Sequence, residues 1–206
     1  MKERSILLEI ACGDLNDALA ADAARSDRIE LCSALELEGL TPSLGTAVEV
    51  DRRLSVPFVA MVRPRAGGFV YSSDEKAVML RDAQLLVDAG AVGIVVGCLT
   101  SSGTIDARAC EKFVALAGEA EIVFHRAFDR IKDQVGALET LMDLGFTRVL
   151  TSGGAPTALA GARRIRALVE RAAGRIEILP AGGIRENNVE AVVMQTGCEQ
   201  VHLSRR

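Results

Sequence analysis

Short apolar runs alternate with helical patterns along this 206-residue chain, and that alternation constrains the fold more than any other feature. Eight of the runs are typical of buried β-strands, because they are short and bounded by turn residues. The predicted strands cover residues 5–10, 28–31, 56–62, 92–96, 121–125, 146–150, 176–179 and 199–203. Between them, charged and apolar residues recur at helical spacing. The predicted helices cover residues 14–25, 43–53, 72–89, 106–117, 131–144, 156–171 and 185–195.

Eight strands alternating with seven helices are typical of a TIM-like (β/α)8 barrel of the α/β class, here one domain over residues 1–206. The final helix is missing or truncated. An open, doubly wound sheet is the competing architecture, but it usually has fewer strands. A missing helix leaves apolar barrel surface uncovered, so we expect a homo-oligomer, either a dimer or a tetramer. The long loop at residues 63–73 is the alternative cover.

Charge and composition narrow the choice of partners and compartment. The net charge is −4, which argues against a nucleic-acid or anionic-membrane partner. No apolar run reaches the roughly 18 residues that a membrane span needs, and no signal-peptide pattern is present. We therefore expect a cytoplasmic, reducing setting. The five cysteines, at positions 12, 32, 98, 110 and 198, form no CxxC pair and are expected to be free thiols.

In such barrels the chemistry lies at the carboxyl ends of the strands. His125 ends a predicted buried strand within the stretch Phe124–Asp129, where a functional histidine competes with a satisfied core histidine. Side-chain alternation turns Glu9 and Glu30 into the barrel. Because unpaired buried carboxylates are costly, they need partners, and Arg28, Arg63 and His125 are the candidate cations. The alternatives are an ion-pair lattice that fills the barrel and a site in which Glu9, Glu30 and His125 perform acid–base catalysis.

The sequence also predicts an anion-binding region. Glycine turns after the sixth and seventh strands expose backbone N–H groups, and barrels often bind phosphate near the last strands. Arg185 and Arg205 lie close by in the sequence. The predicted substrate-binding residues are Arg63, Arg65, Arg126, Asp129, Ser152, Gly153, Gly182 and Gly183. A small anion, such as a phosphorylated or carboxylate compound, is the expected ligand, and no nucleotide cofactor is expected.

Two cysteines end neighbouring strands, and thiolates suit Cu(I). Alternation places Cys12 outside the barrel and Cys32 inside, which counts against a shared ion. A free cysteine is also a good small hydrophobe. Every lysine lies at the N-terminus or in a helical pattern, so a Schiff-base aldolase, which needs an inner lysine, is disfavoured. No HExxH zinc motif is present.

Several strand-end motifs together resemble the CutC copper homeostasis family. They span residues 6–204 and are Leu8-Glu9-Ile10, Ile29-Glu30-Leu31-Cys32, Gly39–Ser43, Arg63-Pro64-Arg65, Phe69–Ser72, Phe124–Asp129, Arg148–Gly153 and Val201-His202. The resemblance implies a cytosolic, usually oligomeric TIM-like barrel that is linked to copper. Glu38 stands where the family usually has the first glycine of a pair, and the chain stops soon after the eighth strand, where relatives continue.

Three functions remain open from the sequence. The first, implied by the resemblance, is copper binding or handling, by Cys12 and Cys32 for Cu(I), or by His125 and His202 with a carboxylate for Cu(II). The second is a TIM-barrel enzyme that uses acid–base chemistry on a small anionic substrate. The third is a scaffold with no ligand. Whether the protein is an enzyme stays open at this point.

Overall fold

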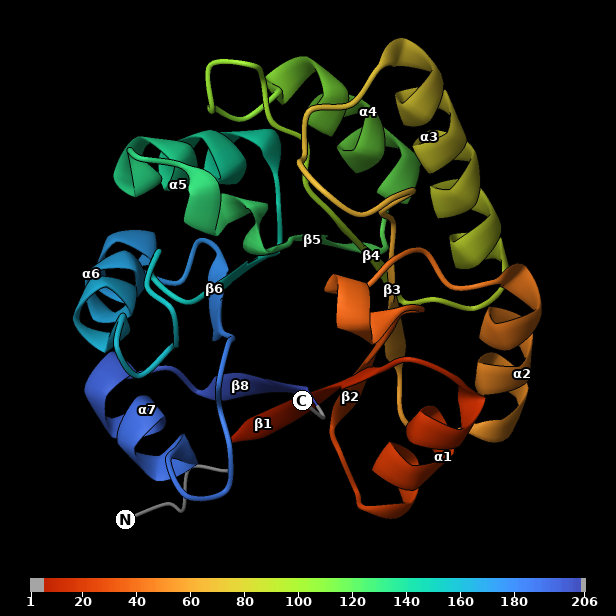
Figure 1. Cartoon of the computed structure of the whole chain (residues 1–206), viewed down its shortest axis with the longest axis horizontal. Coiled ribbons are helices and arrows are strands. Elements are labelled where there is room, and N and C mark those ends of the chain that lie inside the picture. Colours follow the sequence, from red (N-terminus) through yellow and green to blue (C-terminus); the bar gives the residue numbers. More distant parts are fainter. Residues whose placement is uncertain (1–5, 205–206) are drawn as a thin grey trace.

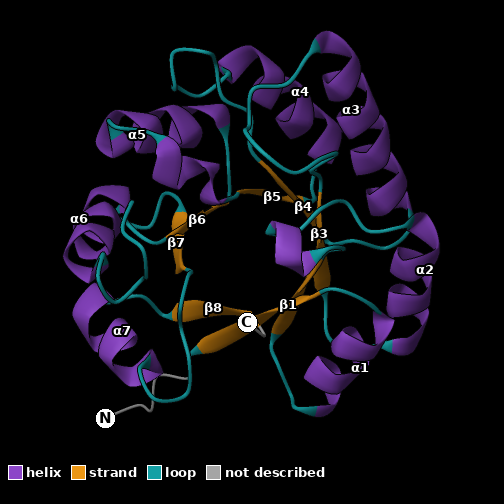
Figure 2. Ribbon diagram, viewed as in Figure 1, coloured by secondary structure: helices purple, strands orange, loops and turns teal. Residues whose placement is uncertain are grey.

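The computed structural model describes residues 6–204, which form the predicted TIM-like barrel (Figures 1 and 2). Eight parallel strands follow one another in the order β7-β6-β5-β4-β3-β2-β1-β8. They are β1 (Leu7–Cys12), β2 (Arg28–Leu31), β3 (Phe58–Met61), β4 (Gly93–Val96), β5 (Glu121–Phe124), β6 (Arg148–Thr151), β7 (Glu177–Pro180) and β8 (Gln200–Ser204). The α-helices surround them as α1 (Leu15–Ala23), α2 (Leu44–Arg53), α3 (Ser73–Asp88), α4 (Ala107–Ala117), α5 (Gln134–Leu144), α6 (Ala162–Ala172) and α7 (Val189–Thr196).

The sheet curls until its first and last strands meet. β1 pairs with both β2 and β8, and a parallel bridge between Ala181 and His202 joins the end of β7 to β8. An open doubly wound sheet, the alternative architecture, does not bring the first strand beside the last. The barrel prediction is therefore confirmed, and the strand boundaries differ from the predicted ones by a few residues. Ser5, the predicted start of the first strand, lies outside the described residues.

Three predicted helix starts were wrong, because side chains fold the preceding residues into other turns. The helix expected from residue 156 begins at Ala162, and the one expected from residue 185 begins at Val189. In the second case the Asn188 side chain accepts a hydrogen bond from the Arg185 N–H and fixes a turn. The helix expected from residue 131 begins at Gln134, after an unpredicted 3-10 helix at Arg126–Arg130.

Apolar residues pack on both sides of the barrel wall, but unequally. The main core lies between the strands and the helices and includes Ile29, Phe124 and Leu138. A smaller cluster inside the barrel consists of Cys32, Val59, Met61, Val95 and Val123. A third cluster, Leu150, Leu179 and Ala181, lies on β6 and at the end of β7. These two small clusters leave the upper interior beside β8, β1 and β2 for the polar groups described below.

The outer faces of β1 and β8 are covered less than those of the other strands. Ile10 and Leu203 are only partly buried, and Figure 1 shows α7 and α1 on either side of this face. No helix follows β8 among the described residues 6–204. The homo-oligomer expected from this feature stays a prediction. No helix of the described chain combines the length and hydrophobicity that crossing a membrane requires.

Glu38 follows the 3-10 helix Leu35–Leu37 with a left-handed backbone, at φ 70° and ψ 26°. A side chain in this region costs about 1 kcal/mol relative to glycine. We therefore expect Glu38→Gly to raise the free energy of unfolding by about 0.5–1 kcal/mol, measured by urea denaturation. Glu36→Gly, at an exposed position inside the same short helix, is the control and should destabilise. Equal losses for both variants would contradict the argument.

Candidate functional site

A cavity of about 530 Å³ opens at the carboxyl ends of the strands, where the sequence predicts the chemistry. Charged residues from distant parts of the chain meet there. The 3-10 helix Leu35–Leu37, orange in Figure 1, projects beside the barrel opening, and its Leu35 joins the cavity wall. The polar and sulfur-containing side chains in the lining are Glu30, Cys32, Glu38, Met61, Arg63, His125, Arg126, Asp129, Arg130, Arg185, His202 and Ser204.

Glu9 is buried at the centre of an ion-pair row across three adjacent strands. It lies opposite His202 of β8 and Arg28 of β2 in the strand register, so all three side chains share the inner face. One carboxylate oxygen lies 2.7 Å from Nδ1 of His202, and the other accepts a 2.5 Å hydrogen bond from Nε of Arg28. Glu9 is therefore fully paired before any ligand enters.

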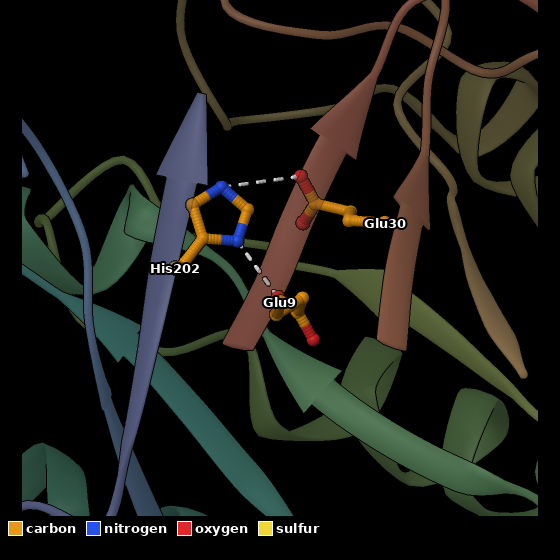
Figure 3. A group of neighbouring side chains, drawn as sticks. All are labelled: Glu9, Glu30 and His202. Carbon is orange, nitrogen blue, oxygen red and sulfur yellow. Dashed lines mark hydrogen bonds and ion pairs between the residues drawn. The ribbon is translucent and has the colours of Figure 1, made fainter. Parts of the chain in front are cut away.

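Glu30 lies one layer above this row and is only partly satisfied. Figure 3 shows His202 between the two carboxylates, with its Nε2 3.7 Å from Oε2 of Glu30. The Cys32 thiol also faces that oxygen, at 3.5 Å. The other oxygen, Oε1, is buried without a hydrogen-bond partner in the part of the chain that the structure describes. An orphaned buried carboxylate oxygen is costly and indicates a group that binds something further.

The three buried groups have shifted pKa values. Burial opposes ionisation of Glu9, but His202 and Arg28 outweigh it and lower its pKa to about 2. Burial raises the pKa of Glu30, despite the favourable charge of His202. For His202, burial opposes protonation, yet the carboxylates of Glu30 and Glu9 raise its pKa. Ligand atoms of Glu9, Glu30 and His202 lie within 4.8 Å of one another, close enough to surround one metal ion.

His125 lies immediately after β5, not within it as predicted, and caps the 3-10 helix Arg126–Arg130. Its Nδ1 accepts a hydrogen bond of 3.1 Å from the Ala127 N–H, which is why the strand ends at Phe124. The ring lies 4.9 Å from the ring of Phe69. Burial, followed by the charge of Arg63, lowers the pKa of His125 to about 3, so the ring is neutral.

Arg63 and Arg65 mainly hold loops in place. The Arg63 guanidinium lines the cavity, but it donates to the carbonyls of Leu37, Gly39 and Gly67 and stacks over Phe69. Arg65 pairs with Glu75 outside the cavity lining. Of the three candidate cations for the inner carboxylates, Arg28 pairs with Glu9, but Arg63 and His125 do not; the second partner of Glu9 is His202.

The loop after β6 is already occupied by a carboxylate of the protein. Asp129 accepts hydrogen bonds from the Ser152 and Gly154 N–H groups and from the Thr151 and Ser152 hydroxyls. Arg126 pairs with the same carboxylate. Ser152 and Gly153 do not line the cavity, whereas Gly182 and Gly183 do. Gly154 also lines the cavity, but its N–H is already bonded to Asp129, so within the described chain an incoming anion would find unbonded amides in the glycine turn after β7 rather than in the one after β6.

The two strand-end cysteines lie on opposite sides of the barrel wall, as their alternation predicts. Cys12 is packed in the outer core, and its thiol points at the Ile10 carbonyl. Burial raises the pKa of the Cys12 thiol to about 12. Cys32 lines the cavity beside Met61. A metal ion in the cavity could therefore be bound by Cys32 but not by Cys12.

The lower interior of the barrel holds a polar network that the sequence analysis does not predict. Arg148 pairs with Glu121 and Glu177, and the Gln200 amide links Glu177 to Arg28. Side-chain alternation does indicate part of it. Gln200 stands two residues before the inward-facing His202, and Arg28 stands two residues before the inward-facing Glu30, so both should also face inward. Phe69, by contrast, comes from a loop, and no periodicity places it against His125. Arg205 lies outside the described residues.

Comparisons with known proteins agree on one family. The family described as CutC matches residues 6–206. A CutC family protein from Treponema denticola is 51% identical over 98% of this chain and 82% of its own length. The human protein named copper homeostasis protein cutC homolog is 42% identical over 97% of this chain and 73% of its own length.

The solved structures agree with this. The CutC crystal structure from Streptococcus agalactiae superposes with a TM-score of 0.92 at 36% identity, covering 98% of this chain and 99% of that one. An aldolase, QR15, superposes with a TM-score of 0.73 at 15% identity, covering 99% of this chain and 92% of that one, and so shares only the fold.

Proposed function

Because the chain belongs to the CutC family, we propose that it is a copper homeostasis protein that binds one copper ion inside the upper barrel. The proposed ligands are His202, Glu30 and Cys32. The observation that carries the proposal is the orphaned Oε1 of buried Glu30, next to an imidazole and a thiol. Imidazole suits copper in both common oxidation states, and a thiol favours Cu(I).

The orientation of His202 supports its role as a ligand. Its Nδ1 is held by Glu9 at 2.7 Å, which leaves Nε2 directed towards Glu30. A carboxylate that accepts the second ring N–H of a metal-binding histidine fixes the ring and raises its basicity. Glu9 therefore orients the ligand, and Arg28 in turn holds Glu9.

The other two residues that the sequence suggests as copper ligands, Cys12 and His125, are not part of the proposed site. Cys12 faces the outer core. His125 uses Nδ1 as an acceptor, so its Nε2 carries the proton and has no lone pair for a metal. The proposed set therefore takes Cys32 from the set that the sequence suggests for Cu(I), and takes His202 and a carboxylate, Glu30, from the set that it suggests for Cu(II).

We also propose that the protein functions in the cytoplasm. The cysteines at positions 12, 32, 98, 110 and 198 are all free and buried. A reducing compartment would keep the Cys32 thiol available and copper as Cu(I).

Copper titration against a competing chromophoric chelator tests the proposal, with Cu(I) under anaerobic conditions and Cu(II) in a separate series. We expect Cys32→Ser to weaken Cu(I) binding by at least about 10-fold, since soft sulfur is lost. Glu30→Gln should weaken Cu(II) binding by a similar factor, because it removes the charged oxygen ligand.

Cys12→Ser is the matched control for these titrations. It makes the same substitution in an equally buried strand-end cysteine on the other side of the wall, and it should leave copper affinity unchanged. If Cys12→Ser weakened binding as much as Cys32→Ser, while Glu30→Gln had no effect, the site would be misplaced.

A further inference from the structure

The imidazole of His125 presents a fixed hydrogen-bond donor to the cavity. Nδ1 accepts the Ala127 N–H, so the proton of the neutral ring must be on Nε2. That Nε2 is buried, and it has no hydrogen-bond partner among residues 6–204. The residue lines the cavity and is 4% exposed. A buried N–H without an acceptor is costly, which indicates a missing ligand oxygen.

Positive groups line the cavity next to this donor. Arg126 follows His125 in the chain, and its guanidinium lies against Gly182, where a Cβ would come within 3.3 Å of Nη1. The N–H groups of Gly182 and Gly183 donate no hydrogen bond within the described chain. Arg185 completes this part of the lining. Free amides beside guanidinium groups form a site for an oxyanion.

We propose that this cavity binds a small carbonyl compound that carries a phosphate or carboxylate group. The carbonyl oxygen accepts the hydrogen bond from Nε2 of His125. The anionic group is held by Arg126, Arg185 and the amides of Gly182 and Gly183. The volume of about 530 Å³ is within the range of small-molecule sites. This site goes beyond the proposed copper function, since it uses none of the three copper ligands.

Two substitutions of His125 separate its binding role from its structural role. Asparagine is a good N-cap, so His125→Asn keeps an acceptor for the Ala127 N–H but removes the donor at Nε2. His125→Gln places an amide N–H near the position of Nε2 and loses the cap. A merely structural role predicts that the glutamine variant is the more damaged in every assay.

Calorimetric titrations of the purified protein should use dihydroxyacetone phosphate, pyruvate and inorganic phosphate as probes. We expect His125→Asn to weaken the binding of the carbonyl compound about 10-fold, the value of one hydrogen bond, and to leave inorganic phosphate unaffected. His125→Gln should retain most of the affinity despite a lower melting temperature. Arg185→Gln should weaken all the probes that bind.

The two carbonyl compounds identify the anionic group: tighter binding of dihydroxyacetone phosphate assigns a phosphate, and tighter binding of pyruvate assigns a carboxylate. The proposal is overturned if neither carbonyl compound binds below about 10 mM, or if His125→Asn binds them as tightly as the unaltered protein. Copper affinity, measured in the same variants, should not change. This keeps the outcome separate from that of the copper proposal.

Discussion

Glu9→Gln is expected to lower the free energy of unfolding by about 3–5 kcal/mol, the usual cost of removing one partner from a buried ion pair. Glutamine has nearly the same shape but no charge. It removes the negative charge that pairs with the buried Arg28 guanidinium and that holds His202, and the neutral amide oxygen of Gln200, which also accepts from Arg28, supplies no charge in its place. Urea denaturation at neutral pH measures the loss.

The pH dependence of this loss follows from the lowered pKa of Glu9, which is about 2 in the folded protein against 4.5 for the ordinary carboxyl. A group whose pKa falls on folding stabilises the protein fully above its unfolded pKa, and this stabilisation is lost as the pH falls towards the folded pKa. The difference between the two proteins should therefore narrow as the pH falls below about 4.5. It should also narrow as the pH rises through the raised pKa of His202, because the contact between Glu9 and protonated His202 is part of what the substitution removes.

Glu111→Gln is the control for this substitution. It makes the same change at an exposed position on α4, and surface changes of this kind usually stay within about 0.5 kcal/mol. A Glu9→Gln loss no larger than that of the control would mean that the row Arg28–Glu9–His202 is not an ion pair in solution.

Asp129→Asn is expected to cost about 3 kcal/mol, because an acceptor-only carboxylate is replaced by a group that also donates. In the folded protein, the donors around this carboxylate are the Thr151 hydroxyl, the hydroxyl and N–H of Ser152, the Gly154 N–H and the Arg126 guanidinium. An amide NH₂ would face one of these donors whichever way it turned. The loops after β5 and β6 would then separate.

Asp133→Asn provides the comparison for Asp129. Asp133 caps α5 by accepting from the Gly136 N–H, and it is exposed. Asparagine is as good an N-cap as aspartate, so this variant should lose only a few tenths of a kcal/mol. Urea denaturation of both variants gives the answer. Equal losses would contradict the view that Asp129 fills an anion site in the loop after β6.

The sequence predicts the barrel well because burial in a TIM-like fold depends on local periodicity. Alternation along β1 and β2 turns Glu9 and Glu30 inward, and the strand register then fixes their neighbours. It also separates Cys12 from Cys32. Alternation does not predict which of the inward-facing charged side chains form ion pairs, since that depends on how far each strand is staggered against the next.

The loops are where prediction from the sequence was weakest. The glycine turns after β6 and β7 have similar sequences, Ser152-Gly153-Gly154 and Ala181-Gly182-Gly183, but different roles. The first is filled by the Asp129 side chain from the loop after β5, and no local pattern indicates that contact. In the same way, the sequence makes Arg63 one of three candidate partners for the inner carboxylates, yet it donates to backbone carbonyls of two loops.

In the proposed copper site, the upper barrel holds one metal ion between groups from β8, β2 and the residue after β2. Anomalous diffraction at the copper absorption edge, from crystals grown with Cu(I) under anaerobic conditions, tests it most directly. We expect a single strong peak bounded by Nε2 of His202, the carboxylate of Glu30 and the thiol of Cys32. A peak at Cys12 or on the outer surface, with none inside the barrel, would contradict it.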